Sequence, residues 1–261
     1  MTGSPDPPTL VLVHGLAILR RADRMFTGLP EALAARGFRV TRALVQGDGS
    51  LAGLSRRLAE RLQAIDGPLA LLCHSMGGLQ ARQAILDDAL AVRVRAIATV
   101  GSPHAGTPLA RAGKLFNRAY RDLTPAARAR WQEEHGEAER AAIERHRIRR
   151  LCAIARLTGP APSPSLRAPH ALLRLLDGPS DGLVPATSQA WGEVVVEASL
   201  DHLQCAMVDA TQPARDRAVA LWMRLAEAAT DRSNRDETAA VATRPAPDEV
   251  ATRTGDGERN R

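Results

Sequence analysis

Aromatic side chains are scarce in this sequence: Phe, Trp and Tyr together make up 3% of its 261 residues. Nucleic-acid-binding modules use such rings to stack on bases, and no recognition motif of that class occurs here. We therefore expect no nucleic-acid partner. Cysteine is also rare, with three residues, an odd number that does not suggest a disulfide framework.

Long apolar runs are missing as well. No stretch approaches the roughly 18 apolar residues that cross a bilayer. The first eight residues lead directly into an apolar segment, without the basic region, apolar core and cleavage site of a signal peptide. The default expectation is a cytoplasmic protein, although a misassigned start codon would hide a signal peptide.

What the chain has is an alternation of apolar strands and amphipathic helices, with 44% hydrophobic residues to form one core. We expect strands at 10–13, 38–45, 69–73, 96–100, 171–176 and 194–196, and helices at 25–36, 51–65, 79–90 and 213–229. This order favours an α/β fold with a mostly parallel, doubly wound sheet. In such sheets the active site lies at the carboxyl ends of the strands.

The most informative segment is 69–79, where an apolar strand runs into Cys73-His74-Ser75-Met76-Gly77-Gly78 and then into a helical pattern. A small residue two positions before a serine and a glycine two positions after it are typical of a nucleophile elbow, a sharp turn between strand and helix. The small residues let strand and helix pack closely. The motif is short and also fits a structural glycine-rich turn.

Further elements follow in the order that an α/β hydrolase requires. The apolar run 10–13 ends in His14-Gly15, which suits a loop near the nucleophile. Downstream, Asp181 lies in a turn, and His202 follows the predicted strand 194–196.

Together these residues resemble the bacterial lipases and esterases of the α/β-hydrolase fold, in particular the triacylglycerol lipases. The matching motifs are His14-Gly15-Leu16, His74-Ser75-Met76-Gly77-Gly78, Gly101-Ser102-Pro103-His104-Ala105-Gly106, Asp181-Gly182-Leu183-Val184 and His202-Leu203. Five elements in the right order are far more specific than any one of them.

The resemblance implies a role for each site residue. Ser75 would be the nucleophile, His202 its general base and Asp181 the acid that fixes the tautomer of the histidine. The backbone N–H groups of Leu16 and Met76 would form the oxyanion hole. This chemistry needs no cofactor and no metal.

Other residues compete for these roles. Structural or solvated roles suit the remaining six histidines better than catalysis: His14, His74, His104, His135, His146 and His170. Asp177 is the second candidate for the acid. Asp201 adjoins His202, and a neighbour in sequence usually points elsewhere.

The chain also departs from the family. Cys73 replaces the usual first glycine of the elbow, and we expect it to be a small buried residue. The secreted lipases carry a cysteine and a calcium-binding aspartate where this chain has Thr187 and Gln204. We therefore predict neither that disulfide nor that calcium ion.

Between the Ser75 and Asp181 halves, residues 111–164 form a predicted helical insertion, a lid or cap over the cleft. Thr124-Pro125 is a helix start. The apolar positions Ile148, Leu151, Cys152, Ala155 and Leu157 fit one face of a helix that runs to Thr158-Gly159. The predicted divisions are thus 1–110 and 165–230 for the hydrolase core, 111–164 for the insertion, and 231–261 for a polar tail expected to be disordered.

The insertion is basic: residues 111–156 hold twelve Arg or Lys against six Asp or Glu, a balance of +6 that equals the net charge of the whole chain. Such a segment would suit transient contact with an anionic lipid surface or an acidic acyl-carrier partner. The alternative is a solvated helix face in an arginine-rich composition, since Lys114 is the only lysine.

The sequence thus predicts a serine hydrolase that cleaves carboxylic, lipid-like acyl esters through an acyl-enzyme. A thioesterase or acyltransferase would use the same residues. From another class, an inactive homologue would bind a lipid or a partner through the insertion. The sequence leaves the acyl chain length, the alcohol and the oligomeric state open.

Overall fold

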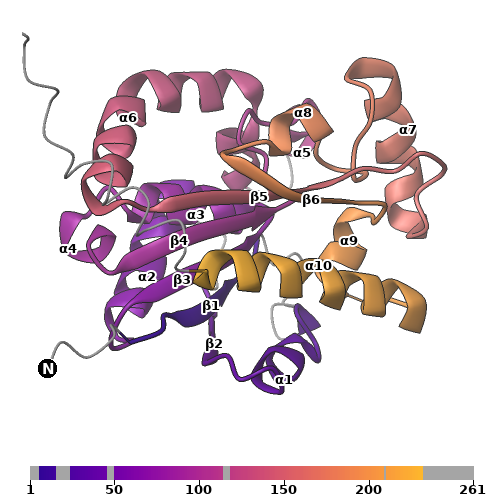
Figure 1. The fold of residues 1–261 in the computed structure, drawn as a ribbon. Helices are drawn as coiled ribbons and strands as arrows, with labels where there is room; N and C mark the ends of the chain where they lie inside the picture. The colour runs from indigo at the N-terminus through magenta and orange to yellow at the C-terminus, as the bar shows by residue number, and fades with distance from the viewer. Residues whose placement is uncertain (1–5, 16–23, 46–49, 114–117, 209, 232–261) are drawn as a thin grey trace, which may run out of the picture. The chain divides into compact units, whose positions relative to one another are not determined.

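The computed structural model describes residues 6–15, 24–45, 50–113, 118–208 and 210–231. Its centre is a six-stranded sheet of order β2-β1-β3-β4-β5-β6 in which every neighbouring pair is parallel (Figure 1). The strands are β1 (Thr9–Val13), β2 (Val40–Ala43), β3 (Leu69–His74), β4 (Val94–Val100), β5 (Arg149–Ala155) and β6 (Glu193–Ala198). The predicted α/β class and its parallel, doubly wound sheet are confirmed.

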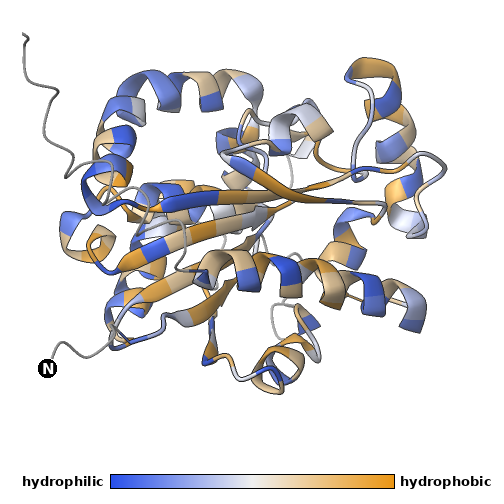
Figure 2. Cartoon of the chain, viewed as in Figure 1, coloured by the Kyte–Doolittle hydropathy of each residue, from blue (hydrophilic) through white to orange (hydrophobic). Residues whose placement is uncertain are grey.

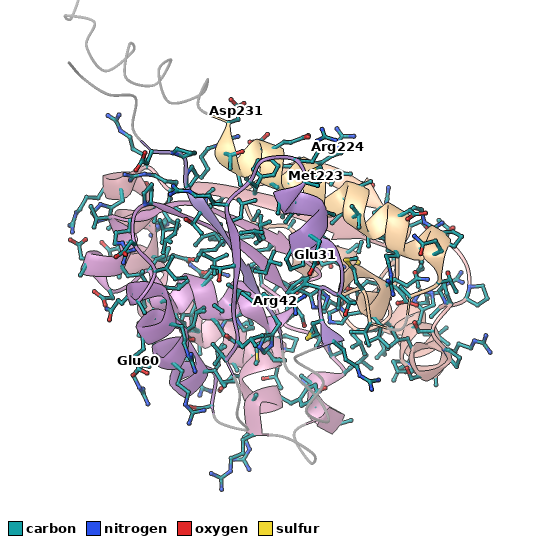
Figure 3. The ribbon with its side chains drawn as sticks, turned by 90° about the horizontal axis from the view of Figure 1, so that it is seen from below. Glu31, Arg42, Glu60, Met223, Arg224 and Asp231 are labelled. Carbon is teal, nitrogen blue, oxygen red and sulfur yellow. The ribbon has the colours of Figure 1, made fainter. Side chains whose placement is uncertain are left out.

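Helices cover both faces of the sheet, because its central strands are apolar on both sides. On one face lie α2 (Leu51–Gln63), α3 (Met76–Ala84) and α6 (Pro125–His146), and on the other α1 (Leu29–Ala34) and α10 (Gln212–Thr230). In Figure 3 the labelled Glu31 of α1 and Met223 of α10 lie on one side of the sheet and Glu60 of α2 on the other.

Several expected elements are confirmed with shifted ends. The helices predicted at 51–65 and 213–229 are α2 and α10, and Thr124 caps α6 as expected, with its hydroxyl accepting from the Ala127 amide at 3.3 Å. The helix predicted at 25–36 shortens to α1, and the one at 79–90 divides into α3 and α4 (Asp88–Ala91).

The helix predicted across 148–157 is wrong. Residues 149–155 form β5, which pairs with β4 and with β6, and its last five residues are all buried. A short run of continuous apolar residues fits a doubly buried strand as well as a buried helix, so periodicity alone could not separate the two. The predicted insertion 111–164 therefore includes a strand of the sheet, and α6 is the crossover helix from β4 to β5, with Ala142 and Ile143 in the core.

The strand predicted at 171–176 is also wrong. This segment belongs to helix α7 (Arg167–Leu176), which buries His170 and Leu173 three positions apart. Ala, Leu and Arg are good helix formers, and this one-sided burial follows the helical period. The remaining short helices are α5 (Ala110–Gly113), α8 (Ala186–Gln189) and α9 (His202–Cys205), with 3₁₀ turns at Arg118–Leu123 and Pro164–Leu166.

Two earlier predictions concern the ends of the chain and membranes. The tail predicted to be disordered, 231–261, lies outside the described residues except for Asp231. Within the described ranges, no helix is both long enough and apolar enough to cross a bilayer. The role of the 111–164 segment as a lid stays a prediction.

Candidate active site

Ser75 occupies a strained turn between β3 and α3. Its φ of 55° and ψ of −131° lie where non-glycine residues are rarely found, a conformation that costs on the order of 1–3 kcal/mol. The Ser75 amide donates to the Val100 carbonyl at 2.9 Å, which ties the turn to β4. Strain of this kind is often found at functional sites, so it indicates that the placement of the Ser75 side chain has a functional role.

Glycines make this turn possible. A Cβ at Gly77 would lie 2.6 Å from the Val13 carbonyl oxygen, and one at Gly15 would lie 2.5 Å from the Ser75 Cβ. Both distances are shorter than atoms tolerate. The close approach predicted from the Ser-x-Gly pattern is therefore present, and the His14-Gly15 loop lies against the serine.

The structure brings Ser75, His202 and Asp181 together from three separate parts of the chain. The His202 Nε2 atom lies 2.9 Å from the Ser75 Oγ, and the His202 Nδ1 atom lies 2.7 Å from the Asp181 Oδ2. The His202 amide also donates to the Asp181 carbonyl at 2.8 Å. One imidazole thus bridges a hydroxyl and a carboxylate, an arrangement that can move a proton from the serine.

Asp181 is fully buried, and its charge is compensated by hydrogen bonds. The Oδ1 atom accepts from the backbone amides of Leu183 at 2.9 Å and Val184 at 2.8 Å, while Oδ2 faces His202. Three polar partners thus surround this one buried carboxylate. In the turn Asp181-Gly182-Leu183-Val184, the backbone folds back so that its last two amides donate to the Asp181 carboxylate.

Asp201 has a different role from the one its position beside His202 would suggest. Its carboxylate caps α9 by accepting from the Leu203 and Gln204 amides, and the Gln204 side chain accepts from the Asp201 amide to complete a capping box. The capping box fixes the start of the helix on which His202 stands. The other rival, Asp177, is exposed at the end of α7.

Gly101 is a site residue that the sequence argument did not single out. It follows β4 with a φ of +60°, and a Cβ there would lie 2.8 Å from the Asp181 Oδ2 and 3.2 Å from the His202 Nδ1. Its place at the carboxyl end of a central strand, in the Gly101-Ser102-Pro103-His104 motif, was the available signal.

We expect Gly101→Ala to lower kcat/KM by about 100-fold, because the added methyl group displaces either the carboxylate or the imidazole by a fraction of an ångström or more. The measurement is kcat/KM on a soluble ester. Gly159→Ala is the matched control, since its added Cβ has no atom within 4 Å. Equal activities of the two variants would contradict the expectation.

The predicted oxyanion donors are only partly described. Met76 is the first residue of α3, so its amide lies at the positive end of a helix directly after Ser75. Leu16 lies outside the described residues, although the adjoining Gly15 packs against Ser75. The assignment of both amides to the oxyanion hole stays a prediction.

Three rival histidines are buried next to the site. The His14 Nε2 atom accepts from the Val45 amide at 3.2 Å, and its Nδ1 lies 2.7 Å from the Gly15 carbonyl. His74 donates from Nε2 to the His202 carbonyl at 3.1 Å, and its ring lies 4.6 Å from the His202 ring. His104 stacks on Trp191 at 5.3 Å. These rings support the loops around Ser75 and His202.

The other three histidines lie elsewhere. His146 contacts Asp88 at 2.7 Å, His135 lies near Glu134, and His170 is buried in α7. Burial lowers the pKa of the His14 ring and lowers those of His74 and His104 well below 6.5. Neighbouring charges lower two of these pKa values further. His202 lowers the pKa of His74, and Arg82 and Arg128 lower that of His104.

These pKa values predict a loss of stability in acid. Below pH 6.5 the three rings bind protons more readily in the unfolded chain than in the folded one. The free energy of unfolding therefore falls as pH decreases towards the pKa values of the folded protein, by up to about 1.4 kcal/mol per pH unit for each ring. Above pH 6.5 they contribute no pH dependence. Urea unfolding on both sides of pH 6.5 measures the slope. His104→Gln should make this slope shallower, and a flat profile below pH 6.5 would be the contrary result.

All three cysteines are free and buried. Burial raises the pKa of each thiol, so Cys73 is neutral and closed to solvent, as expected for a small core residue. Among the residues that the structure describes, no group of three His, Cys, Asp or Glu side chains is placed to hold a metal ion. Gln204, which occupies the position of a calcium-binding residue in the resembling lipases, is used in the capping box of α9.

A buried ion pair behind the site also escaped the sequence argument. Arg82 of α3 forms two hydrogen bonds with Glu139 of α6, at 2.5 and 2.7 Å, and its guanidinium lies 4.9 Å from the Trp131 ring centre. Its Nη1 lies 3.3 Å from the Nδ1 of His104. The pair fixes α6 on α3 and supports the loop after β4. Arg82 and Glu139 are 57 positions apart in the sequence, and no local pattern connects them, so the sequence did not predict this contact.

A hollow of about 450 Å³ lies between α2, the end of α3 and α6, and it is lined in part by Ala59, Gln83 and Trp131. Ser75, Asp181 and His202 do not line it, so it is separate from the candidate active site.

A parallel, doubly wound sheet with a strained serine after β3, followed along the chain by an aspartate in a turn and a histidine at a helix start that contact each other, defines an α/β hydrolase. The chain belongs to this group: the model of the Alpha/beta hydrolase family matches residues 10–251. No protein of curated function matches the sequence.

Solved structures resemble the fold. The mature lipase BlEst2 of Bacillus licheniformis is 18% identical with a TM-score of 0.67, and the match covers 83% of this chain and 94% of that one. The metagenomic carboxyl esterase MGS0156 is 22% identical with a TM-score of 0.69, over 87% and 80% of the two chains. The Staphylococcus hyicus lipase is 14% identical with a TM-score of 0.61, over 92% and 99%. At these identities the likeness concerns the fold.

Proposed function

We propose that the protein is a serine hydrolase that cleaves carboxylic esters with a lipid-like acyl group. The observation that carries the proposal is the continuous contact from the Ser75 Oγ through His202 to Asp181, at 2.9 and 2.7 Å. The similarity to structures described as lipases and a carboxyl esterase supports the same substrate class.

The chemistry runs in two halves. The His202 Nε2 accepts the Ser75 proton as Oγ attacks the ester carbonyl, and the same proton then passes to the departing alcohol to leave an acyl-serine. In the second half, water loses a proton to His202 and attacks the acyl-serine, which releases the acid and restores the hydroxyl. Asp181 holds Nδ1 protonated throughout, so that Nε2 is free to accept.

The oxyanion of each tetrahedral intermediate would be stabilised by the amide of Met76 and by that of Leu16. Preorganised donors of this kind are each worth roughly 10²- to 10³-fold in rate. Because Met76 N–H stands at the start of α3, the helix dipole adds to its effect. This chemistry involves no cofactor.

The proposal is tested by the wild-type enzyme on p-nitrophenyl esters from acetate to palmitate, with acyl-coenzyme A thioesters of the same acyl groups in parallel. We expect turnover of the oxygen esters, and the chain-length optimum separates an esterase from a lipase. Faster turnover of the thioesters would reassign the protein to the thioesterases. A folded enzyme that hydrolyses neither series would contradict the proposal and favour a binding homologue.

A further inference from the structure

Helix α7 presents an unusual apolar face to solvent. Leu172, Leu175 and Leu176 are 46%, 86% and 60% exposed, and they make up three of the six large apolar side chains that are exposed among the described residues. Positions 172, 175 and 176 share one side of the helix, which faces away from the buried His170. Scattered exposed leucines need no explanation, but a cluster on one helix marks an interaction surface.

Within α7 itself the charged side chains are basic. Arg167 and Arg174 are exposed on one side of the leucines, separated from Leu175 by Ala171, and α7 contains no acidic residue before Asp177 at its C-cap. Exposed leucines with arginines to one side are the composition of a helix that lies in the headgroup region of an anionic membrane. Figure 2 shows the alternation of hydrophobic and hydrophilic residues along α7.

The helix is fixed to the turn that carries Asp181. His170 donates from Nε2 to the Gly159 carbonyl at 3.0 Å, and its Nδ1 lies 3.0 Å from the Ser180 Oγ. The same Ser180 Oγ accepts from the Gly182 amide at 3.3 Å. A Cβ at Gly182 would touch Leu166 and His170. The acid turn, residues 181–184, and α7 are therefore joined by hydrogen bonds and packing into one unit.

Apolar side chains connect this region with the site. Leu183 of the acid turn and Leu203 beside His202 pack against a small cluster formed by Leu157, Ala161 and Leu166, in the segment that leads into α7. Figure 1 shows α7 and α9, which begins with His202, at the same edge of the sheet.

We propose that the leucine face of α7 docks the protein on an anionic lipid surface. Resting on the proposed function, this surface is where the ester substrate is taken up, because α7 and the acid turn form one unit. The basic insertion 111–164 is then not needed for the contact.

Co-sedimentation of the full chain with vesicles of equal parts phosphatidylcholine and phosphatidylglycerol tests the proposal. We expect Leu175→Ser to weaken binding by about tenfold and the triple change of Leu172, Leu175 and Leu176 to serine to abolish it. The matched control is Val92→Ser, at a residue that is 48% exposed and lies at the C-cap of α4, and this variant should bind as the wild type does. Arg174→Gln should weaken binding by about fivefold on these vesicles and leave any binding to pure phosphatidylcholine unchanged.

Three results would overturn the proposal: no binding by the wild type, equal binding by the triple variant, or a wild-type dimer that the triple variant dissociates, since the occupant would then be a second copy. Ser75→Ala should bind vesicles as the wild type does. If the wild type hydrolyses no soluble ester but binds vesicles in an α7-dependent way, the proposed function fails while the docking surface stands.

Discussion

Replacing Ser75 by alanine is expected to lower kcat on a soluble p-nitrophenyl ester by about 10⁴- to 10⁶-fold. The change removes the Oγ that lies 2.9 Å from the His202 Nε2 and leaves no nucleophile for the acyl-enzyme. The turn itself should survive, because Ser75 is held by its backbone amide and by the glycines around it. KM should change little.

Ser102→Ala is the matched control. Ser102 is also buried near the end of a central strand, but its Oγ has no hydrogen-bond partner among the described residues and packs against Gly78. Its loss should leave kcat within about threefold of the wild type, since surrounding contacts change little. Comparable losses in both variants would mean that the effect of Ser75→Ala comes from disturbed packing, which contradicts its role as nucleophile.

Asp181→Asn is expected to lower kcat by about 10⁴-fold with little change in the fold. The asparagine carbonyl would keep the amides of Leu183 and Val184 as donors, so its NH₂ group would face the His202 Nδ1. That contact places the imidazole proton on Nε2. The Nε2 atom can then no longer accept the proton of Ser75. The measurement is kcat together with the urea midpoint, which shows whether stability is retained.

Asp177→Asn distinguishes the two acids that the sequence offered. Asp177 is exposed after α7, so its substitution should leave kcat unchanged. A loss of activity in Asp177→Asn with full activity in Asp181→Asn would contradict the assignment of the acid.

The sequence was most informative where local pattern and tertiary role coincide. Strands β1 and β3 are short apolar runs that end in His-Gly and His-Ser, and such punctuated runs predict both the strand and the loop that follows it. The Ser75 turn could be predicted because its steric demands fall on residues two positions away. His202 and Asp181 could be proposed because their order along the chain matches a known pattern.

The sequence was misleading in two apolar segments. The apolar positions from 148 to 155 follow a helical spacing, yet residues 149–155 form a strand, and the apolar run 171–176, predicted as a strand, belongs to a helix. What decides between them is burial on both faces for β5 and on one face for α7, which depends on tertiary neighbours.

Contacts between distant residues that belong to no known motif pattern could not be predicted. The Arg82–Glu139 pair, the His170–Ser180 contact and the packing of Gly101 against Asp181 each depend on the completed fold. None is marked by a local motif that specifies its partner.

The central claim, that Ser75 is the nucleophile of an ester hydrolase, is tested most directly by fluorophosphonate labelling followed by mass spectrometry of the labelled peptide. A phosphonate ester forms only on an activated serine, so we predict one adduct, on Ser75 in the wild type, and none in Ser75→Ala or Asp181→Asn at equal exposure times. An adduct on another serine, or a folded wild type that takes up no label, would contradict the account.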